Sequence, residues 1–102
     1  MSDMIQYLPV IALRGTTILP DMIVHFDVSR KKSVKALEKA MVEDQRVFLI
    51  TQKAPQTEDP GQEDLYKIGT IAVIKQLVKT KNGIIQVLVE GWERGELLHL
   101  DE

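Results

Sequence analysis

The sequence predicts a β-rich α+β domain, with five to six mostly antiparallel strands in a compact or partly closed sheet and one α-helix. Three observations predict it. Apolar and polar residues alternate from Met22 to Val28, which is typical of a half-buried strand. Within 30–44, apolar residues recur at three- and four-residue spacing, as in an amphipathic helix. Asn82-Gly83, the strongest turn signal, separates two long apolar runs.

The chain opens with a predicted strand, a corner and a loop. Residues 5–13 are largely apolar. Because proline donates no backbone hydrogen bond, Pro9 places this strand at a sheet edge or makes it a strand start. Arg14-Gly15 is a corner, and residues 16–21 form a loop that Pro20-Asp21 closes.

A second strand and the helix follow. In the strand, one face is apolar and includes Val24 and Phe26, whereas the other face carries His25. Ser29 is the expected N-cap of the helix because its hydroxyl can accept from a free backbone N–H. The apolar stripe of the helix consists of Val34, Leu37, Ala40 and Met41. Leu37 lies at the centre of this stripe, so we expect it in the core.

The second half of the chain is expected to contain four strands, at Val47–Ile50, Ile68–Lys79, Ile84–Glu90 and Glu96–Leu100. Residues 52–66 combine Pro, Gly and acidic side chains, which indicates an exposed acidic loop. Gly91 is expected to bend the chain between the last two strands. Asn82-Gly83 is expected to make a two-residue hairpin turn.

Composition places the chain among single globular domains. It has 102 residues, of which 44% are hydrophobic, and a formal net charge of −2. This charge gives no overall basic field for nucleic acid or an anionic membrane. No cysteine is present, which fits a reducing, cytoplasmic environment. We find neither a signal peptide nor an apolar run near the about 20 residues that span a bilayer.

Motifs for catalysis or cofactor binding are missing from the sequence. There are two histidines, His25 and His99, and no nucleophile elbow accompanies them. No cluster of His, Cys or carboxylates has the spacing of metal ligands, and no Gly-rich phosphate loop precedes a lysine. The acidic stretch 58–64 lacks the spacing of a calcium loop. We therefore expect no catalytic residue, no metal and no cofactor.

Two groups of residues are candidates for binding. Arg30, Lys31 and Lys32 head the helix, although the helix dipole favours acids there. They form a candidate anion site, and the alternative is a solvated face whose lysines meet Asp27 or the acidic loop.

The other candidate is the apolar loop at Ile18, Leu19, Pro20 and Met22. One interpretation is an exposed patch that docks unfolded polypeptide, so that Leu19, Pro20 and Met22 bind substrate. In the alternative, the loop folds back and plugs one end of the sheet.

Several segments, in order, resemble the opening of the Lon protease N-terminal domain. They are Leu8-Pro9-Val10-Ile11-Ala12-Leu13-Arg14, Leu19-Pro20-Asp21-Met22, Val28-Ser29-Arg30-Lys31-Lys32-Ser33, Ala36-Leu37-Glu38-Lys39-Ala40-Met41, Gly69-Thr70 and Val87-Leu88-Val89-Glu90-Gly91. The resemblance covers nearly the whole chain. The family commonly has Pro at Ala12, Gly at Asp21 and Ser29, and Leu-Pro at Thr80-Lys81.

The resemblance implies a partly closed, PUA-like pseudobarrel. It implies a substrate-recognition and assembly domain of a cytosolic ATP-dependent protease, which binds unfolded or damaged proteins and forms a homo-oligomer in the full-length protein. Residues 1–102 would then be the first, β-rich part of the N-terminal region. The family's ATPase loop and Ser–Lys dyad are absent, so we expect no catalysis.

The competing function is a free-standing PUA-like domain that binds RNA or a small anion. Arg30, Lys31 and Lys32 support it, but the net charge and the few aromatic residues weigh against nucleic acid. We also expect self-association. If Glu96–Leu100 is a strand without a following partner, its unpaired edge favours a strand-exchanged dimer.

Overall fold

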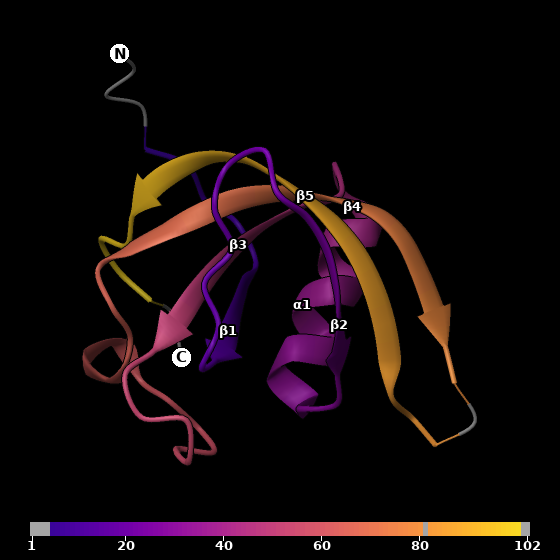
Figure 1. The fold of residues 1–102 in the computed structure, drawn as a ribbon, viewed down its shortest axis with the longest axis horizontal. Coiled ribbons are helices and arrows are strands. Elements are labelled where there is room, and N and C mark those ends of the chain that lie inside the picture. Colours follow the sequence, from indigo (N-terminus) through magenta and orange to yellow (C-terminus); the bar gives the residue numbers. More distant parts are fainter. Residues whose placement is uncertain (1–4, 81, 101–102) are drawn as a thin grey trace.

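The computed structural model describes residues 5–80 and 82–100. In Figure 1, a curved sheet of five strands arches over one helix, α1 (Lys31–Val42). The strands are β1 (Val10–Arg14), β2 (Ile23–Val28), β3 (Arg46–Gln52), β4 (Ile68–Lys79) and β5 (Ile85–Glu96). A 3-10 turn, η1 (Gln62–Asp64), lies within the acidic loop.

The sheet order is β1-β3-β4-β5-β2, so β1 and β2 are its edges and the sheet is not closed. Three strand pairs are antiparallel, and β1 pairs with β3 in parallel. The predicted fold class is therefore confirmed. Pro9 does precede an edge strand, as expected.

Two apolar clusters cover the two faces of β3, which lies between β1 and β4. Val47 and Leu49 belong to the larger cluster, whereas Phe48 and Ile50 belong to the smaller one. Helix α1 contributes Leu37, which is fully buried, so its predicted core position is confirmed. Met41, from the same predicted stripe, is instead 41% exposed because the buried face of the helix is centred on Leu37 and Ala40.

Some predicted boundaries are wrong. The residue at the helix N-cap is Arg30, not Ser29, and its side chain makes no capping hydrogen bond. Strand β5 does not end at Glu90 as predicted, because a bulge next to Gly91 lets it continue to Glu96. The hairpin turn is longer than two residues, since Thr80 and Ile84 form the closing hydrogen bond. Gly83 in this turn has a φ of 78°.

The predicted strand Glu96–Leu100 is also wrong, because Glu96 ends β5 and residues 97–100 are not a strand. Leu97 and Leu100 pack against the smaller apolar cluster. The Leu97 N–H donates to the Lys67 carbonyl at 2.7 Å, and the Leu100 N–H donates to Gln62 Oε1 at 3.0 Å. The unpaired final strand that motivated the strand-exchanged dimer is therefore missing, and β5 lies between β4 and β2.

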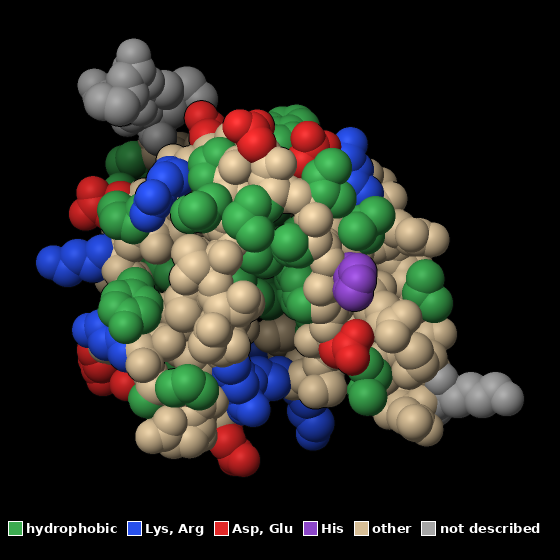
Figure 2. All heavy atoms as spheres, in the orientation of Figure 1, with side chains coloured by type: hydrophobic (Ala, Val, Ile, Leu, Met, Phe, Trp, Pro, Cys, Tyr) green, Lys and Arg blue, Asp and Glu red, His purple; other side chains and the backbone are tan. Residues whose placement is uncertain are grey.

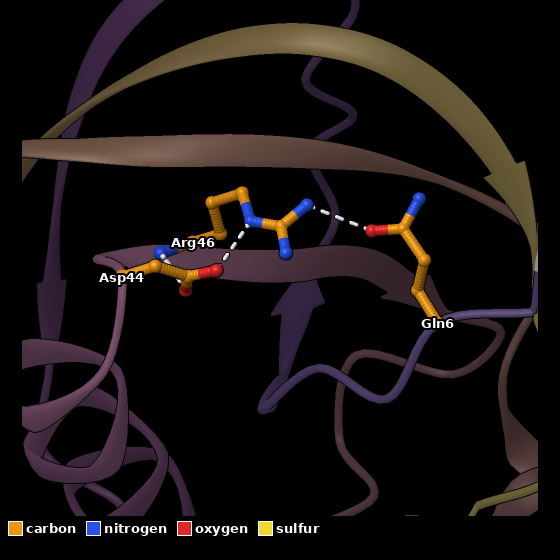
Figure 3. A network of polar contacts seen from close by, with 3 residues as sticks. All are labelled: Gln6, Asp44 and Arg46. Atoms are coloured by element: carbon orange, nitrogen blue, oxygen red, sulfur yellow. Dashed lines mark hydrogen bonds and ion pairs between the residues drawn. The ribbon is translucent and has the colours of Figure 1, made fainter.

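A polar network at the start of β3 attaches the N-terminal segment to the sheet (Figure 3). Arg46 Nε donates to Asp44 Oδ2 at 2.7 Å, and Arg46 Nη1 donates to Gln6 Oε1 at 2.7 Å. The hydrogen bond from the Arg46 side chain lowers the pKa of Asp44. The loop that follows β1 lies at the opposite end of the β1–β3 pair from this network.

Candidate functional site

The loop between β1 and β2 is attached to the sheet by backbone hydrogen bonds. The Asp21 N–H donates to the Gly91 carbonyl at 2.8 Å, and the Gly91 N–H donates to the Met22 carbonyl at 2.9 Å. Nearer the start of the loop, Thr70 Oγ1 donates to the Ile18 carbonyl at 2.5 Å. Strands β4 and β5 therefore hold the loop at both ends of its apolar segment.

Glycine at position 91 allows this close approach. A Cβ atom built there would lie 2.4 Å from the Leu19 carbonyl oxygen, far inside van der Waals contact. Asp21 turns the loop with a φ of 70°, a conformation that glycine favours and aspartate tolerates. The sequence therefore places a small residue under the loop and a turn-tolerant residue within it.

One portion of the loop is buried against the sheet and another is exposed, so each of the two interpretations from the sequence describes one portion. Ile18 is 4% exposed and belongs to the larger apolar cluster. Leu19 and Met22 remain 42% and 37% exposed, Pro20 is half-buried, and Ile23 at the start of β2 is 63% exposed. We call Leu19, Pro20, Met22 and Ile23 the loop patch.

Figure 2 shows this face of the molecule. Hydrophobic side chains gather around its upper centre, where the loop between β1 and β2 crosses the sheet in Figure 1. A hollow lies below them, with Lys and Arg side chains at its lower border. Ile23 lies on the same exposed face of β2 as His25 and Asp27, although it is apolar.

The basic cluster at the start of α1 faces the acidic loop. Lys32 Nζ lies 2.7 Å from Asp59 Oδ1, and Arg30 Nη2 donates to the Thr57 carbonyl at 3.2 Å. Burial and the nearby charge of Arg14 lower the pKa of Arg30, while the acidic loop acts in the opposite direction. Lys31 is exposed. An anion at this cluster would compete with the acidic loop.

Gln52, the last residue of β3, holds the acidic loop through its side chain. Its side chain is almost completely buried, and its Nε2 donates to the Ala54 carbonyl at 2.6 Å and the Thr57 carbonyl at 2.7 Å. Because Thr57 also accepts from Arg30, the loop is connected to both β3 and α1. This anchor could not be predicted from the sequence, since a glutamine at the end of a strand is usually exposed.

Two open depressions lie next to each other at Tyr66 and Lys67, with volumes of about 530 and 290 Å³. Neither is lined by a His or Cys, so neither offers a nucleophile with an adjacent imidazole base. Over residues 5–80 and 82–100, no three His, Cys, Asp or Glu side chains are grouped so as to hold a metal ion. No helix in the same residues is long and apolar enough to cross a bilayer.

Comparison with known proteins gives a consistent result. The family model for the ATP-dependent protease La (LON) substrate-binding domain matches residues 7–102. The chain is 54% identical over 94 residues to Lon protease of Heliobacterium modesticaldum, which covers 92% of this chain and 12% of that protein. It is 47% identical over 97 residues to Lon protease of Desulforamulus reducens, with 95% and 12% covered. The chain thus spans only 12% of the length of these relatives.

Solved structures share the fold. The N-terminal domain of a Mycobacterium avium complex Lon protease superposes with a TM-score of 0.67 at 23% identity, over 87% of this chain and 44% of that one. A Lon N-terminal domain protein from Xanthomonas campestris gives a TM-score of 0.66 at 14% identity, over 88% of this chain and 48% of that one.

Proposed function

Because this chain belongs to the LON substrate-binding domain family, we propose that it binds unfolded or damaged polypeptides for an ATP-dependent protease, through Leu19, Pro20 and Met22. One observation carries the proposal. Backbone bonds to Gly91 fix the loop so that Leu19 and Met22 stay exposed while their neighbour Ile18 is buried. A fixed apolar surface loses little conformational entropy on binding, which favours capture of apolar segments.

We propose that the chain itself has no catalytic role. Its candidate surface consists of apolar side chains and backbone, and its two histidines lie at unrelated positions, on β2 and near residue 100. ATP hydrolysis and peptide cleavage would belong to other parts of the full-length protein. The cytoplasmic location stays a prediction.

One such patch is small, so we propose that its affinity is weak and that several copies act together. In a homo-oligomer, neighbouring patches would engage one flexible chain, and the effective concentration of each further patch would raise the overall affinity. This arrangement would also give the domain its proposed role in assembly.

The test measures binding of a permanently unfolded protein, reduced and carboxymethylated lysozyme, to the 102-residue chain. The double variant Leu19→Ser, Met22→Ser removes two half-exposed apolar side chains, so we expect roughly tenfold weaker binding. Met41→Ser is the matched control, because Met41 is 41% exposed but lies on α1. Equal losses in the two variants, or no binding by the unaltered chain, would overturn the proposal.

A further inference from the structure

Strand β2 is an edge strand, and the backbone N–H and C=O groups on its outer side pair with no other strand. The Gly91 N–H donates to the Met22 carbonyl, which makes the adjacent pair Ile23 and Glu90 a non-hydrogen-bonded pair of the antiparallel ladder. Hydrogen-bonded and non-hydrogen-bonded pairs alternate along β2, and its ladder with β5 has no register shift. Ile23, His25 and Asp27 therefore direct their N–H and C=O groups away from β5, toward the free edge.

Apart from the acidic Asp27, this edge carries none of the usual protection. Proteins commonly shield an edge strand with Lys, Pro or a bulge. The sequence of β2, IVHFDV, contains no Lys, Arg or Pro, and its ladder with β5 has no bulge. The other edge strand, β1, is preceded by Pro9 and ends at Arg14. Within residues 5–80 and 82–100, no backbone hydrogen bond from a loop or turn reaches the outer edge of β2.

We infer that an extended segment of unfolded polypeptide binds along β2 as an added antiparallel or parallel strand, beside the loop patch. This inference rests on the proposed function and specifies how substrate is held. Only an extended backbone offers donors and acceptors at the spacing of Ile23, His25 and Asp27. Side chains of the added strand that point toward the loop would cover Met22 and the half-buried Val24 and Phe26.

A second copy of the chain fits this edge less well than a flexible segment. Six residues of strand are about 20 Å long, and one strand spacing of about 4.8 Å gives roughly 100 Å² of edge. A stable interface between folded proteins needs roughly 800 Å² from each partner. A flexible segment can add contacts beyond the strand, because it can bend onto Leu19.

The first test uses two synthetic peptides that differ only in their backbone. One is an eight-residue peptide of alternating Val and Thr with Lys at both ends, and the other carries N-methyl groups on consecutive central residues, which blocks both of its edges. We expect the first peptide to slow amide hydrogen exchange at Ile23, His25 and Asp27. We expect the N-methylated peptide to bind about tenfold more weakly and to leave exchange unchanged. Equal binding of the two peptides would overturn the inference.

The second test changes one donor in the protein. Because the N–H of His25 points outward, His25→Pro removes this donor and keeps the ladder with β5, as proline is tolerated on the outer side of an edge strand. His25→Val is the matched control, since it loses the imidazole and keeps the N–H. We expect peptide binding to fall about tenfold in His25→Pro only. Equal affinity of the two variants contradicts the inference, and if His25→Pro does not fold, the peptide pair decides.

The outcomes separate this inference from the proposed function. If unfolded lysozyme binds and Leu19→Ser, Met22→Ser weakens it, while the two peptides bind equally, the proposed function stands and strand addition is wrong. If unfolded lysozyme does not bind, both are wrong. If exchange at Ile23, His25 and Asp27 slows with rising concentration of the chain alone, a second copy occupies the edge and the inference is overturned.

Discussion

Gly91 lets the loop between β1 and β2 approach the sheet closely because it has no side chain. Its N–H and C=O form hydrogen bonds with Met22 and Asp21, and a Cβ atom at this position would collide with the Leu19 carbonyl oxygen. The exposed position of Leu19 therefore depends on a residue far away in the sequence. Two substitutions at the residue scale test this dependence.

Gly91→Ala should displace the loop. A Cβ atom 2.4 Å from the Leu19 carbonyl oxygen meets backbone, which cannot turn aside as a side chain can. We expect the free energy of unfolding to fall by about 1–3 kcal/mol, measured by chemical denaturation. Gly95→Ala is the control, because its Cβ would lie 3.4 Å from a Phe48 ring carbon. Similar stabilities of the two variants would show that the loop does not rest on Gly91.

Asp21 tests the backbone conformation of the same loop. Its φ of 70° costs a side-chain-bearing residue about 1–2 kcal/mol, and most for a β-branched one. We expect Asp21→Gly to be at least as stable as the unaltered chain and Asp21→Val to be less stable, by melting temperature. The reverse order would mean that position 21 does not need a left-handed conformation.

At the scale of elements, α1 is held by a narrow apolar stripe. Leu37 and Ala40 are fully buried, whereas Val42 at the end of the helix is 86% exposed. Leu37→Ala should lower the free energy of unfolding by about 2–5 kcal/mol because it leaves a cavity. Val42→Ala should change it little. Equal effects in a denaturant titration would contradict the packing of the helix.

The acidic loop and the basic cluster form a second pair of interacting elements. Lys32 and Asp59 are both largely exposed, so Asp59→Asn should change stability by less than about 1 kcal/mol. If Arg30, Lys31 and Lys32 bind anions, the same change should strengthen binding of inorganic pyrophosphate, measured by calorimetry, because it removes a competing carboxylate. No pyrophosphate binding by either form would contradict the anion site.

The spacing of apolar residues predicted the helix and most strands, because the type of each element depends on its local sequence pattern. The bounds of β4, Ile68–Lys79, match the long apolar run predicted before Asn82-Gly83. The end of β5 was wrong because alternation cannot show that a bulge at Gly91 absorbs one extra residue. The helix start was wrong because Ser29 has the chemistry of a cap, yet Arg30 occupies the N-cap.

At the scale of the whole molecule, the site depends on contacts that no local pattern contains. Leu19, Pro20 and Met22 were found from composition, since apolar residues beside Pro-Asp are unusual in a loop. Whether they were exposed could not be predicted, because that follows from the bonds of the loop to Thr70 and Gly91. The sheet order, with β2 at an edge beside the loop, also depends on contacts between distant segments and could not be predicted.

Residue-resolved amide NMR can show whether the loop patch holds unfolded polypeptide, as we propose. Reduced and carboxymethylated lysozyme is titrated into the ¹⁵N-labelled chain. We expect shift changes to concentrate at residues 18–23 and at Gly91, which is hydrogen-bonded to that loop. Changes that cluster at Arg30, Lys31 and Lys32 and leave residues 18–23 unaffected would contradict it.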